Sequence, residues 1–404
     1  MKHLKLTTLA ATAAIALAPI AQAETLRHAV GSAGVSGLID GTQAWADYIK
    51  EQTGGETEIK IYAGSLLNFT ETFTGLRDGI ADSGFVVPAY HRAELPYANL
   101  LSDMGTAGVD PVAMAGAANE FMFTCAPCLA EFNNAGQIFL GNTVTGPYYM
   151  YNQKPVKALA DFEGIKVRGF GPFARWLDAM GASTVSLGAT DIYESMSQGH
   201  IDGNVHTLET LDTLSTGEVA DYALNQPIAV FIGNTMFNVS AMTWAGLSDQ
   251  TKRAMIDGAA FGHAIATIDS VNQAEAILAD PQAHGVELLE PDADVKEKSE
   301  AFRTSDMEAV VTLNRDEYGI SDAEAQVARF QELVAKWDGL VKDIDTSDPK
   351  AVGDLYLREV FSKIDPASLG YPRSCPVALV RMRRDIPVLS RQTCAQRKLC
   401  RWHI

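Results

Sequence analysis

Hydrophobic positions along the chain fall into short apolar runs that alternate with stretches of helical period. The first helical stretch ends at Gly54 and Gly55, residues that commonly stop helices. Such alternation is typical of an α/β unit built on a parallel sheet. The predicted order is strand, helix, strand, helix and strand, at residues 24–31, 39–55, 57–64, 68–80 and 81–90 respectively.

The same scheme recurs in the middle of the chain, so a second α/β unit is expected there. After Leu247 the pattern becomes almost wholly helical, and these helices could brace both units. Two such units create a cleft at the carboxyl ends of their strands, which is a common place for small ligands. The strands are predicted at 166–170, 183–187 and 201–206, the intervening helices at 172–181 and 190–199, and the late helices at 248–280, 299–318 and 322–344.

Both ends of the chain depart from this pattern. Residues 1–23 combine Lys2 and Lys5 with an apolar core and an Ala-Gln-Ala site before Glu24, which predicts a cleavable signal peptide and a periplasmic mature protein. An uncleaved amino-terminal anchor is the weaker alternative. Residues 371–404 are rich in arginine and lack helical or strand period. A basic interaction tail and an appendage from a shifted or extended reading frame both fit, so no function is assigned to it.

Composition narrows the class of partners. The 404 residues include 32 Lys and Arg against 50 Asp and Glu, a formal net charge of −18, so most of the surface repels nucleic acid and anionic membranes. No later segment has the roughly 18 unbroken apolar residues that a bilayer span needs. No cofactor and no metal are predicted, and the role of a metal ion in ligand binding stays open.

Cys125 and Cys128 form a C-x-x-C pair, which in an exported protein is a disulfide, a redox centre or half of a zinc site. The pair lies inside an apolar, helical pattern and not at a turn from strand to helix. No second C-x-x-C and no His-x-x-x-His accompany it. A local structural disulfide is therefore predicted ahead of redox catalysis, with metal binding last.

An arginine at the end of a predicted strand is the strongest candidate for ligand binding. Arg168 ends a short apolar run and is followed by Gly169 and Gly171, where a ligand could approach the backbone. Its planar guanidinium could hold both oxygens of a carboxylate. Alternatively, Arg168 forms a surface ion pair with Asp161 or Glu163, and the residues alone favour this second interpretation.

The surrounding run 161–203 carries an ordered set of motifs. It reads DFEGIKVRGFGPFARWLDAMGASTVSLGATDIYESMSQGHIDG. This order resembles the substrate-binding proteins of tripartite ATP-independent periplasmic (TRAP) transporters, with their Asp-Leu-x-Gly-Leu-Lys-Val-Arg stretch, Leu-x-x-Leu-Gly-Ala helix, Tyr-x-x-Leu-x-x-Gly helix and Val-Asp-Gly. The resemblance extends from about Thr25 to the helices near residue 340 and leaves out the basic tail.

The resemblance implies a two-lobed periplasmic binding protein fold, with a ligand cleft between the lobes and long carboxyl-terminal helices bracing both. It further implies capture of a small organic acid by domain closure and delivery to TRAP membrane permease subunits, without catalysis. The expected division is 24–146 with about 235–272 as lobe I, 147–234 with about 273–350 as lobe II, 351–370 as a terminal helix and 371–404 as the tail.

The family's binding residues transfer only where positions match. Arg168 stands where the family keeps the arginine that pairs with the ligand carboxylate, and His206 takes the place of an asparagine that often contacts ligand. Where sialic-acid-binding members keep another arginine, this chain has Tyr148, Tyr149 and Tyr151, so a smaller monocarboxylate is favoured. Long terminal helices mediate dimers in some relatives, so monomer and homodimer both stay open.

Weaker candidates complete the predicted substrate-binding set. Aromatic residues at such spacing are more often simply core. The weaker candidates are Phe170, Asn204, Phe85, Tyr90, His91, Tyr149 and Asn234.

The second functional hypothesis is an exported enzyme, either a thiol oxidoreductase that uses Cys125 and Cys128 or a hydrolase, although the chain lacks Gly-x-Ser-x-Gly and His-Glu-x-x-His.

Overall fold

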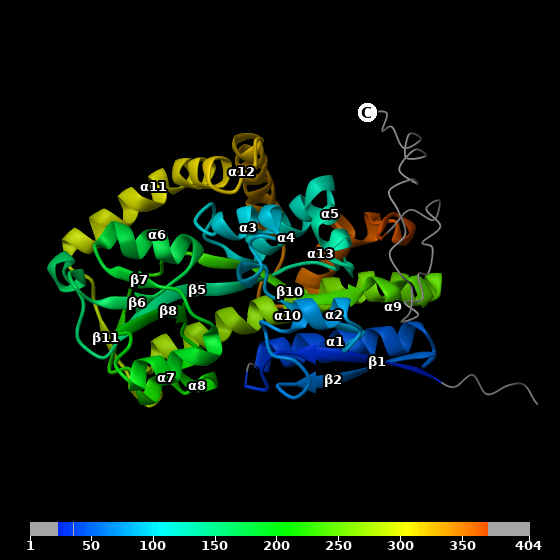
Figure 1. The fold of residues 1–404 in the computed structure, drawn as a ribbon, viewed down its shortest axis with the longest axis horizontal. Coiled ribbons are helices and arrows are strands. Elements are labelled where there is room, and N and C mark those ends of the chain that lie inside the picture. Colours follow the sequence, from blue (N-terminus) through cyan, green and yellow to red (C-terminus); the bar gives the residue numbers. More distant parts are fainter. Residues whose placement is uncertain (1–22, 35, 371–404) are drawn as a thin grey trace, which may run out of the picture. The chain divides into compact units, whose positions relative to one another are not determined.

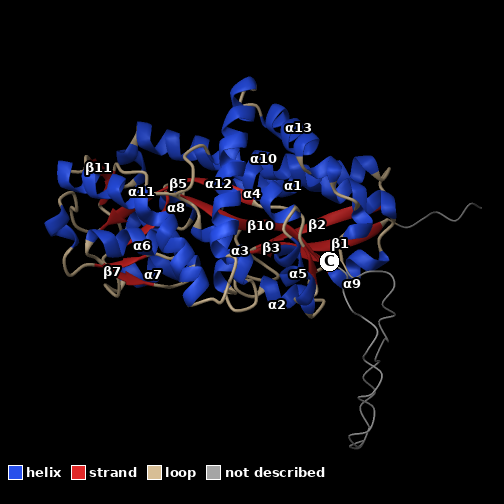
Figure 2. Ribbon diagram, turned by 90° about the horizontal axis from the view of Figure 1, so that it is seen from above, coloured by secondary structure: helices blue, strands red, loops and turns tan. Residues whose placement is uncertain are grey.

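The structure is a computed structural model that describes residues 23–34 and 36–370. The predicted signal peptide, apart from Ala23, and the basic tail with its three cysteines lie outside the described residues. Eleven described strands join into one sheet, whose main path runs β2-β1-β3-β10-β5-β8-β6-β7 (Figure 1). Helices cover both faces of this sheet (Figure 2). The α/β fold class predicted from the alternating pattern is therefore confirmed.

The first half of the sheet corresponds to the first predicted α/β unit. β1 pairs in parallel with β2 on one side and β3 on the other, so the connecting helices cross over the sheet. Trp45 on α1 is fully buried, and its indole Nε1 donates to the Met255 carbonyl at 2.9 Å. The elements are β1 (Glu24–Val30), α1 (Ser36–Gln52), β2 (Thr57–Ala63), α2 (Thr72–Arg77) and β3 (Ser83–Val86).

The second half of the sheet contains the second predicted unit. β6 pairs in parallel with β7 and β8, and the helix α6 follows β6 almost directly. Phe173, Trp176 and Leu177 on α6 are buried, which gives this helix one strongly apolar face. The elements are β6 (Lys166–Arg168), α6 (Gly171–Met180), β7 (Ser183–Val185), α7 (Ile192–Ser197), β8 (Gly203–Thr207) and α8 (Thr210–Thr213).

Two long antiparallel strands join the halves of the sheet. β5 (Thr143–Asn152) and β10 (Val230–Ser240) pair with each other, and each also pairs with strands of its own half. Their mutual pairing is interrupted by register shifts, which are β-bulges or irregularities. The short strands β4 (Gln137–Ile138), β9 (Tyr222–Leu224) and β11 (Glu287–Leu289) extend this framework.

Long helices bind the halves together. α10 runs unbroken through residue 272, where the sequence predicted a change of lobe, and it packs on α1, α13 and β5. α12 packs on α4, and α11 packs on α6. The predicted terminal helix 351–370 is a shorter helix, α13, followed by 3-10 turns. The remaining helices are α3 (Pro96–Asp103), α4 (Pro111–Phe123), α5 (Ala126–Asn134), α9 (Ala241–Gly246), α10 (Asp249–Ala279), α11 (Ala293–Asp316), α12 (Ala323–Leu340) and α13 (Pro349–Glu359).

Helix α5 begins at the C-x-x-C pair. Cys125 and Cys128 form a disulfide, with an S–S distance of 1.99 Å, and the two residues are 3% and 0% exposed. On the same helix, the Glu131 carboxyl accepts hydrogen bonds from the backbone N–H groups of Tyr97 and Ala98, in the first turn of α3. The disulfide thus stabilises a helix that caps its neighbour.

Among the described helices, none is alone long and apolar enough to span a bilayer. The helices α4 and α5 meet the length and composition criteria together, but the chain bends by 76° between them.

Replacing Cys125 and Cys128 with serine is expected to cost about 2 kcal/mol of unfolding free energy, because so short a loop restrains the unfolded chain only modestly. Ligand affinity should stay near that of the wild type. Urea unfolding and calorimetric titration of the double variant check both expectations. An affinity that collapses while the fold survives would place the cysteines in the binding site.

Candidate functional site

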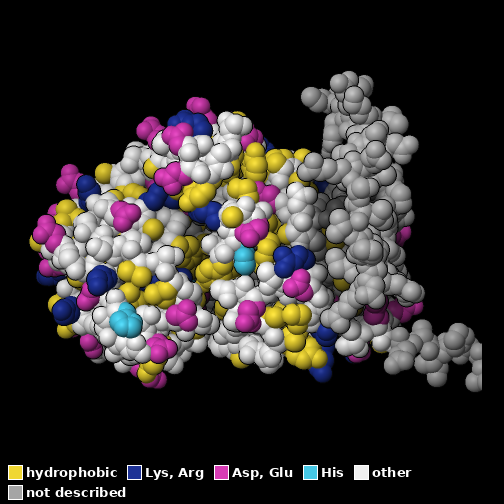
Figure 3. Space-filling view, viewed as in Figure 1, with side chains coloured by type: hydrophobic (Ala, Val, Ile, Leu, Met, Phe, Trp, Pro, Cys, Tyr) yellow, Lys and Arg dark blue, Asp and Glu magenta, His cyan; other side chains and the backbone are white. Residues whose placement is uncertain are grey.

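One cavity collects most of the predicted binding residues. It encloses about 850 Å³ of atom-free space, part of which opens to solvent, and residues from both halves of the sheet line it. Hydrophobic side chains gather around the hollow near the middle of the face seen in Figure 3. A concave, largely apolar site with few polar groups is typical for small ligands. Its apolar wall includes Leu38, Phe69, Phe85, Val87, Phe170, Leu214 and Phe231.

Arg168 is the buried cation of this cavity. It is 1% exposed, and its guanidinium donates from Nε to the Leu187 carbonyl at 3.2 Å and from Nη1 to the Val205 carbonyl at 3.3 Å. Within the described part of the chain, Nη2 donates no hydrogen bond and no carboxylate forms an ion pair with Arg168. The alternative of a surface pair with Asp161 or Glu163 is therefore wrong, and Asp161 instead accepts from two backbone N–H groups of its own turn.

The turn from β6 to α6 sets the position of the guanidinium. Gly171 has φ +52°, in the left-handed region that favours glycine, and a Cβ there would come within 3.4 Å of Asp103 Oδ1. This sharp turn folds Phe170 back, so that its ring centroid lies 4.7 Å from Arg168 Cζ. Two carbonyls and one ring thus hold the guanidinium with one edge unoccupied by protein groups.

His206 lies beside Arg168 and presents a neutral imidazole. Desolvation, and then the Arg168 charge, lower its pKa well below 6.5. The Thr207 backbone N–H donates to His206 Nδ1 at 2.8 Å, so the single proton of the neutral ring lies on Nε2. His206 therefore contributes a hydrogen-bond donor to the cavity without contributing a second positive charge.

Tyr148 is a cavity residue that the sequence did not single out for binding. Its ring is stacked between Phe173, at 4.0 Å, and His206, at 4.8 Å. Burial raises the pKa of its hydroxyl. The Arg168 charge opposes this rise, and the Glu209 charge adds to it. The hydroxyl thus lies within electrostatic reach of both charged groups. Because successive strand residues point to opposite faces, the neighbouring Tyr149 belongs to a different hydrophobic cluster.

The structure brings together six of the nine predicted substrate-binding residues in this cavity, and the other three do not line it. Asn204 lies deeper along β8 than His206, and its amide donates to the Tyr151 hydroxyl at 2.6 Å. His91 does not line the cavity, and its ring stacks on Phe73 at 4.2 Å. Tyr149 packs in a different hydrophobic cluster from Tyr148. None of the three lines this cavity, and their part in ligand binding stays a prediction. The six that line the cavity are Arg168, His206, Phe170, Phe85, Tyr90 and Asn234.

Glu209 is a second ionisable group of the cavity that the sequence did not indicate. It lines the cavity and is 6% exposed. Oε1 accepts from the Ser270 hydroxyl at 3.1 Å, whereas Oε2 has no hydrogen-bond partner among the described residues. Desolvation raises the pKa of Glu209 to about 7, and the charge of the adjacent Asp269 adds to this shift.

The raised pKa of Glu209 predicts a pH-dependent stability. Between its ordinary value of 4.5 and about 7, the folded protein keeps a proton that the unfolded chain releases. The stability that this retained proton contributes is therefore full below pH 4.5 and is lost as the pH rises through 7. Relative to wild type, the unfolding free energy of Glu209→Gln should rise by roughly 1 to 3 kcal/mol between pH 5 and pH 8. Urea unfolding at both pH values checks this, and a constant difference would contradict it.

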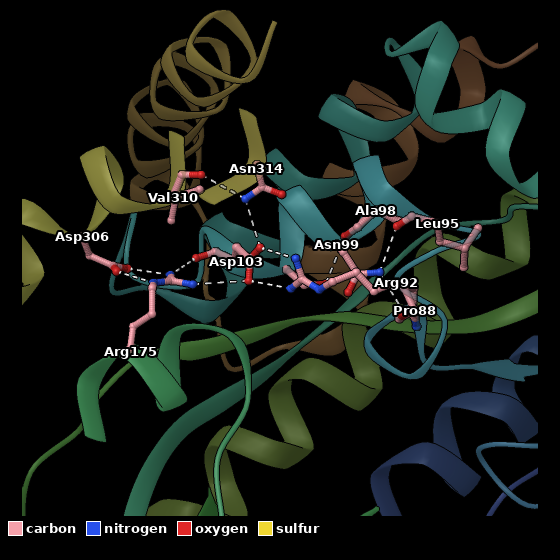
Figure 4. A network of polar contacts seen from close by, with 11 residues as sticks. Pro88, Arg92, Leu95, Ala98, Asn99, Asp103, Arg175, Asp306, Val310 and Asn314 are labelled. Carbon is pink, nitrogen blue, oxygen red and sulfur yellow. Dashed lines mark hydrogen bonds and ion pairs between the residues drawn. The ribbon is translucent and has the colours of Figure 1, made fainter. Parts of the chain in front are cut away.

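A buried polar network anchors the helix that follows Arg168 (Figure 4). Arg175 on α6 donates from Nε to Asp306 Oδ1 at 2.6 Å and from Nη2 to the Asp103 carbonyl at 2.7 Å. Asp103, at the end of α3, also receives two hydrogen bonds of 2.9 Å from Arg92, and Asn314 donates to it at 3.1 Å. The network thereby joins α6 to α3 and α11.

This network is electrostatically balanced by its own members. The Asp103 and Asp306 side chains are fully buried, and the Arg175 side chain is 16% exposed. Burial alone would lower the pKa of Arg175, but hydrogen bonds and charges from the two aspartates raise it. None of these residues lines the cavity, so their role there is to position α6 and the turn before it.

The cavity is thus equipped to bind a small anion with an apolar body. Arg168 supplies the charge, His206 supplies a neutral donor, and aromatic rings supply the walls. Among the described residues, no group of three His, Cys, Asp or Glu side chains is placed to hold a metal ion.

Comparison with known proteins agrees with this geometry. Residues 36–310 match the model of the family DctP, bacterial extracellular solute-binding protein, family 7. A solute-binding protein of Chromohalobacter salexigens is 25% identical over 230 residues, which are 54% of this chain and 64% of that protein. One from Roseobacter denitrificans is 29% identical over 117 residues, which are 28% of this chain and 35% of that protein. The chain thus matches less than two thirds of the length of these curated relatives.

Solved structures confirm the two-lobed α/β class. A TRAP periplasmic solute-binding protein of Bordetella bronchiseptica with bound mandelate superposes with a TM-score of 0.67 at 22% identity, covering 77% of this chain and 99% of that one. A marine metagenome TRAP protein specific for aromatic acids, in complex with 3-hydroxybenzoate, superposes with a TM-score of 0.68 at 18% identity, covering 78% of this chain and 100% of that one. A Rhodoferax ferrireducens TRAP protein with copurified benzoate superposes with a TM-score of 0.67 at 20% identity, covering 78% of this chain and 99% of that one.

Proposed function

Because the chain belongs to the bacterial extracellular solute-binding proteins of family 7, the receptors of TRAP transporters, we propose that it captures a small organic acid and delivers it to TRAP membrane permease subunits. The proposed place of action is the periplasm, reached through the signal peptide at 1–23. The first described strand begins at Glu24, directly after the predicted cleavage site, which supports this division of the chain.

The observation that carries the proposal is the unpaired, buried charge of Arg168. A guanidinium that is 1% exposed and has no carboxylate partner among the described residues is costly unless a ligand completes it. A carboxylate can accept from Nη2 and from the second proton of Nη1, since Nε and one Nη1 proton are already used by carbonyls. The acids bound by the solved relatives have a carboxylate in common, which supports this ligand class.

Capture by domain closure fits the contacts across the cavity. Tyr90 belongs to the proposed lobe I (24–146 with about 235–272) and Ala189 to the proposed lobe II (147–234 with about 273–350). The Ala189 backbone N–H donates to the Tyr90 hydroxyl at 3.2 Å, and both residues line the cavity. We propose that this contact forms as the lobes close on the acid and that its release accompanies delivery to the permease.

The enzymatic alternative has no comparable support. A thiol oxidoreductase needs an accessible thiolate, whereas Cys125 and Cys128 are joined in a buried disulfide on a helix that does not line the cavity. The family model and the structural neighbours are solute-binding proteins. We therefore propose binding, and not catalysis, as the function.

The proposed function is tested by identifying what the protein holds. Mass spectrometry of small molecules released on denaturing the purified mature protein should reveal an organic acid. Calorimetric titration should then show that the acid binds and that its uncharged amide binds much more weakly. Release of a non-acidic molecule, or equal binding of acid and amide, would contradict a receptor for carboxylates.

A further inference from the structure

The cavity holds a buried guanidinium and a buried carboxyl group that do not pair with each other. Arg168 and Glu209 both line it, and neither forms an ion pair with a described residue. We propose that Glu209 is a second ligand-binding group, and that the ligand is an organic acid whose flat apolar body also carries a hydrogen-bond donor, a hydroxyl or an ammonium group. This inference rests on the proposed function, because it assumes that Arg168 binds the carboxylate of the same ligand.

Glu209 is held so that one oxygen remains for a ligand. The Ser270 hydroxyl on α10 donates to Oε1, and Ser270 itself accepts from the Gly146 backbone N–H at 2.9 Å, so this side of the carboxyl is fixed. Oε2 is buried and meets no donor at hydrogen-bonding geometry among the described residues, although the Thr207 hydroxyl and the backbone N–H of Glu209 lie near enough to the carboxyl to lower its pKa. A buried acceptor without a donor is costly, which points to a group supplied from the cavity.

Arg168 and Glu209 line the same cavity, which encloses about 850 Å³ of atom-free space. Each of them perturbs the Tyr148 hydroxyl electrostatically, with opposite sign. Arg168 ends β6, and Glu209 follows the neighbouring strand β8 by two residues. The Val205 carbonyl of β8 accepts from Arg168. A ligand whose carboxylate meets Arg168 therefore has Glu209 within the same cavity wall.

Charge balance argues against a ligand that offers a carboxylate alone. Asp269 also lines the cavity, where it is hydrogen-bonded to Gln273, and His206 is neutral. When Glu209 is ionised, above pH about 7, a ligand with only a carboxylate would add negative charge to a space that holds one cation and two carboxylates. An ammonium group directed at Glu209 would balance this charge, and a hydroxyl would supply a hydrogen-bond donor to Oε2.

The shape of the walls indicates a flat body between the two polar groups. Phe69 and Phe85 pack edge to face at 5.1 Å, as do Phe170 and Phe231. Together with the stacked ring of Tyr148, they surround the cavity with aromatic faces and edges. Aromatic rings pack well against such surfaces.

Two series of acids test the inference by isothermal titration calorimetry. The first is benzoate, 3-hydroxybenzoate and 3-(aminomethyl)benzoate, and the second is phenylacetate, mandelate and phenylglycine. Within each series the carboxylate is constant. The first acid has no donor group, the second carries a hydroxyl and the third carries an ammonium. In at least one series, a donor-bearing acid should bind wild type about tenfold or more tightly than its parent.

Variants at Glu209 assign that preference. Glu209→Leu should remove about tenfold or more of the affinity for the donor-bearing acid and leave the affinity for the parent within about threefold. Glu209→Gln keeps an acceptor oxygen, so it should largely retain a hydroxyl ligand but weaken an ammonium ligand. Glu131→Gln is the matched control, since Glu131 is also buried with a pKa raised to about 7 but lies outside the cavity. It should leave all affinities unchanged.

The outcomes separate this inference from the proposed function. If parents bind as tightly as donor-bearing acids, if the preference survives Glu209→Leu, or if no donor-bearing acid binds, Glu209 is not a ligand group and the inference is wrong. Parent binding that still depends on Arg168 would then leave the carboxylate receptor intact. Circular dichroism and melting curves confirm that each variant is folded. If Glu209→Leu does not fold, Glu209→Gln takes its place in the test.

Discussion

Arg168→Ala is expected to abolish most of the affinity for the acid, with a loss of about 2 to 5 kcal/mol, as found when one partner of a buried charge pair is removed. Arg168→Lys should also weaken binding markedly, because an ammonium cannot copy the planar fork that faces both carboxylate oxygens. The Leu187 and Val205 carbonyls lose their donor in Arg168→Ala, so unfolding free energy should fall by about 1 to 3 kcal/mol without loss of the fold.

Calorimetric titration of wild type and both variants, with the acid and with its amide, is the decisive measurement. The amide should respond little to either substitution, since it never offered the second charge. Arg303→Ala is a suitable control, because Arg303 lies outside this cavity and forms no ion pair among the described residues. Unchanged acid binding in Arg168→Ala would falsify the proposed contact with the carboxylate.

The local periodicity of the sequence predicts most of the parallel strands. β1, β2, β6 and β8 each begin or end within a few residues of the predicted positions, because apolar runs bounded by glycine and polar turns are local signals. The predicted helix at 68–80 is shorter in the structure, where Asn68 accepts from the backbone of Thr70 and Glu71 in a turn before α2 begins at Thr72.

The two strands that join the halves could not be predicted in the same way. β10 is buried along most of its length, so it lacks the alternation of a half-exposed strand, and Gly233 and Asn234 interrupt its apolar pattern. The side-chain amide of Asn238 on β10 donates to the Gln137 side chain, which is 101 residues away in sequence. Such a partner becomes apparent only in the folded chain.

The candidate site shows the same division. Arg168 and Phe170 lie at the carboxyl end of a predicted strand, so their place near a cleft follows from the pattern. Tyr148 is one of several similar tyrosines, and only the register of β5 decides which face it occupies. Glu209 lies in a stretch without distinctive periodicity, and its significance comes from burial against Ser270, 61 residues further on.

Arg175 had no sequence signal at all, yet its removal should have the largest effect on stability. Its partners Asp103 and Asp306 are 72 and 131 residues away along the chain. Arg175→Met should lower the unfolding free energy by about 3 to 5 kcal/mol, because two fully buried carboxylates lose their shared cation. Arg303→Met, on the helix that carries Asp306, should cost less than about 1 kcal/mol.

Double variants separate charge from packing in this network. Adding Asp306→Asn to Arg175→Met removes one unpaired carboxylate, so the double variant should recover part of the lost stability, whereas independent sites would add their losses. Urea unfolding of the four proteins in the cycle measures this. In the folded fraction the acid affinity should remain near that of wild type, because none of these side chains lines the cavity. A single Arg175→Met variant with unchanged stability, or a double variant less stable than the single one, would show that the network does not hold α6 against α3 and α11.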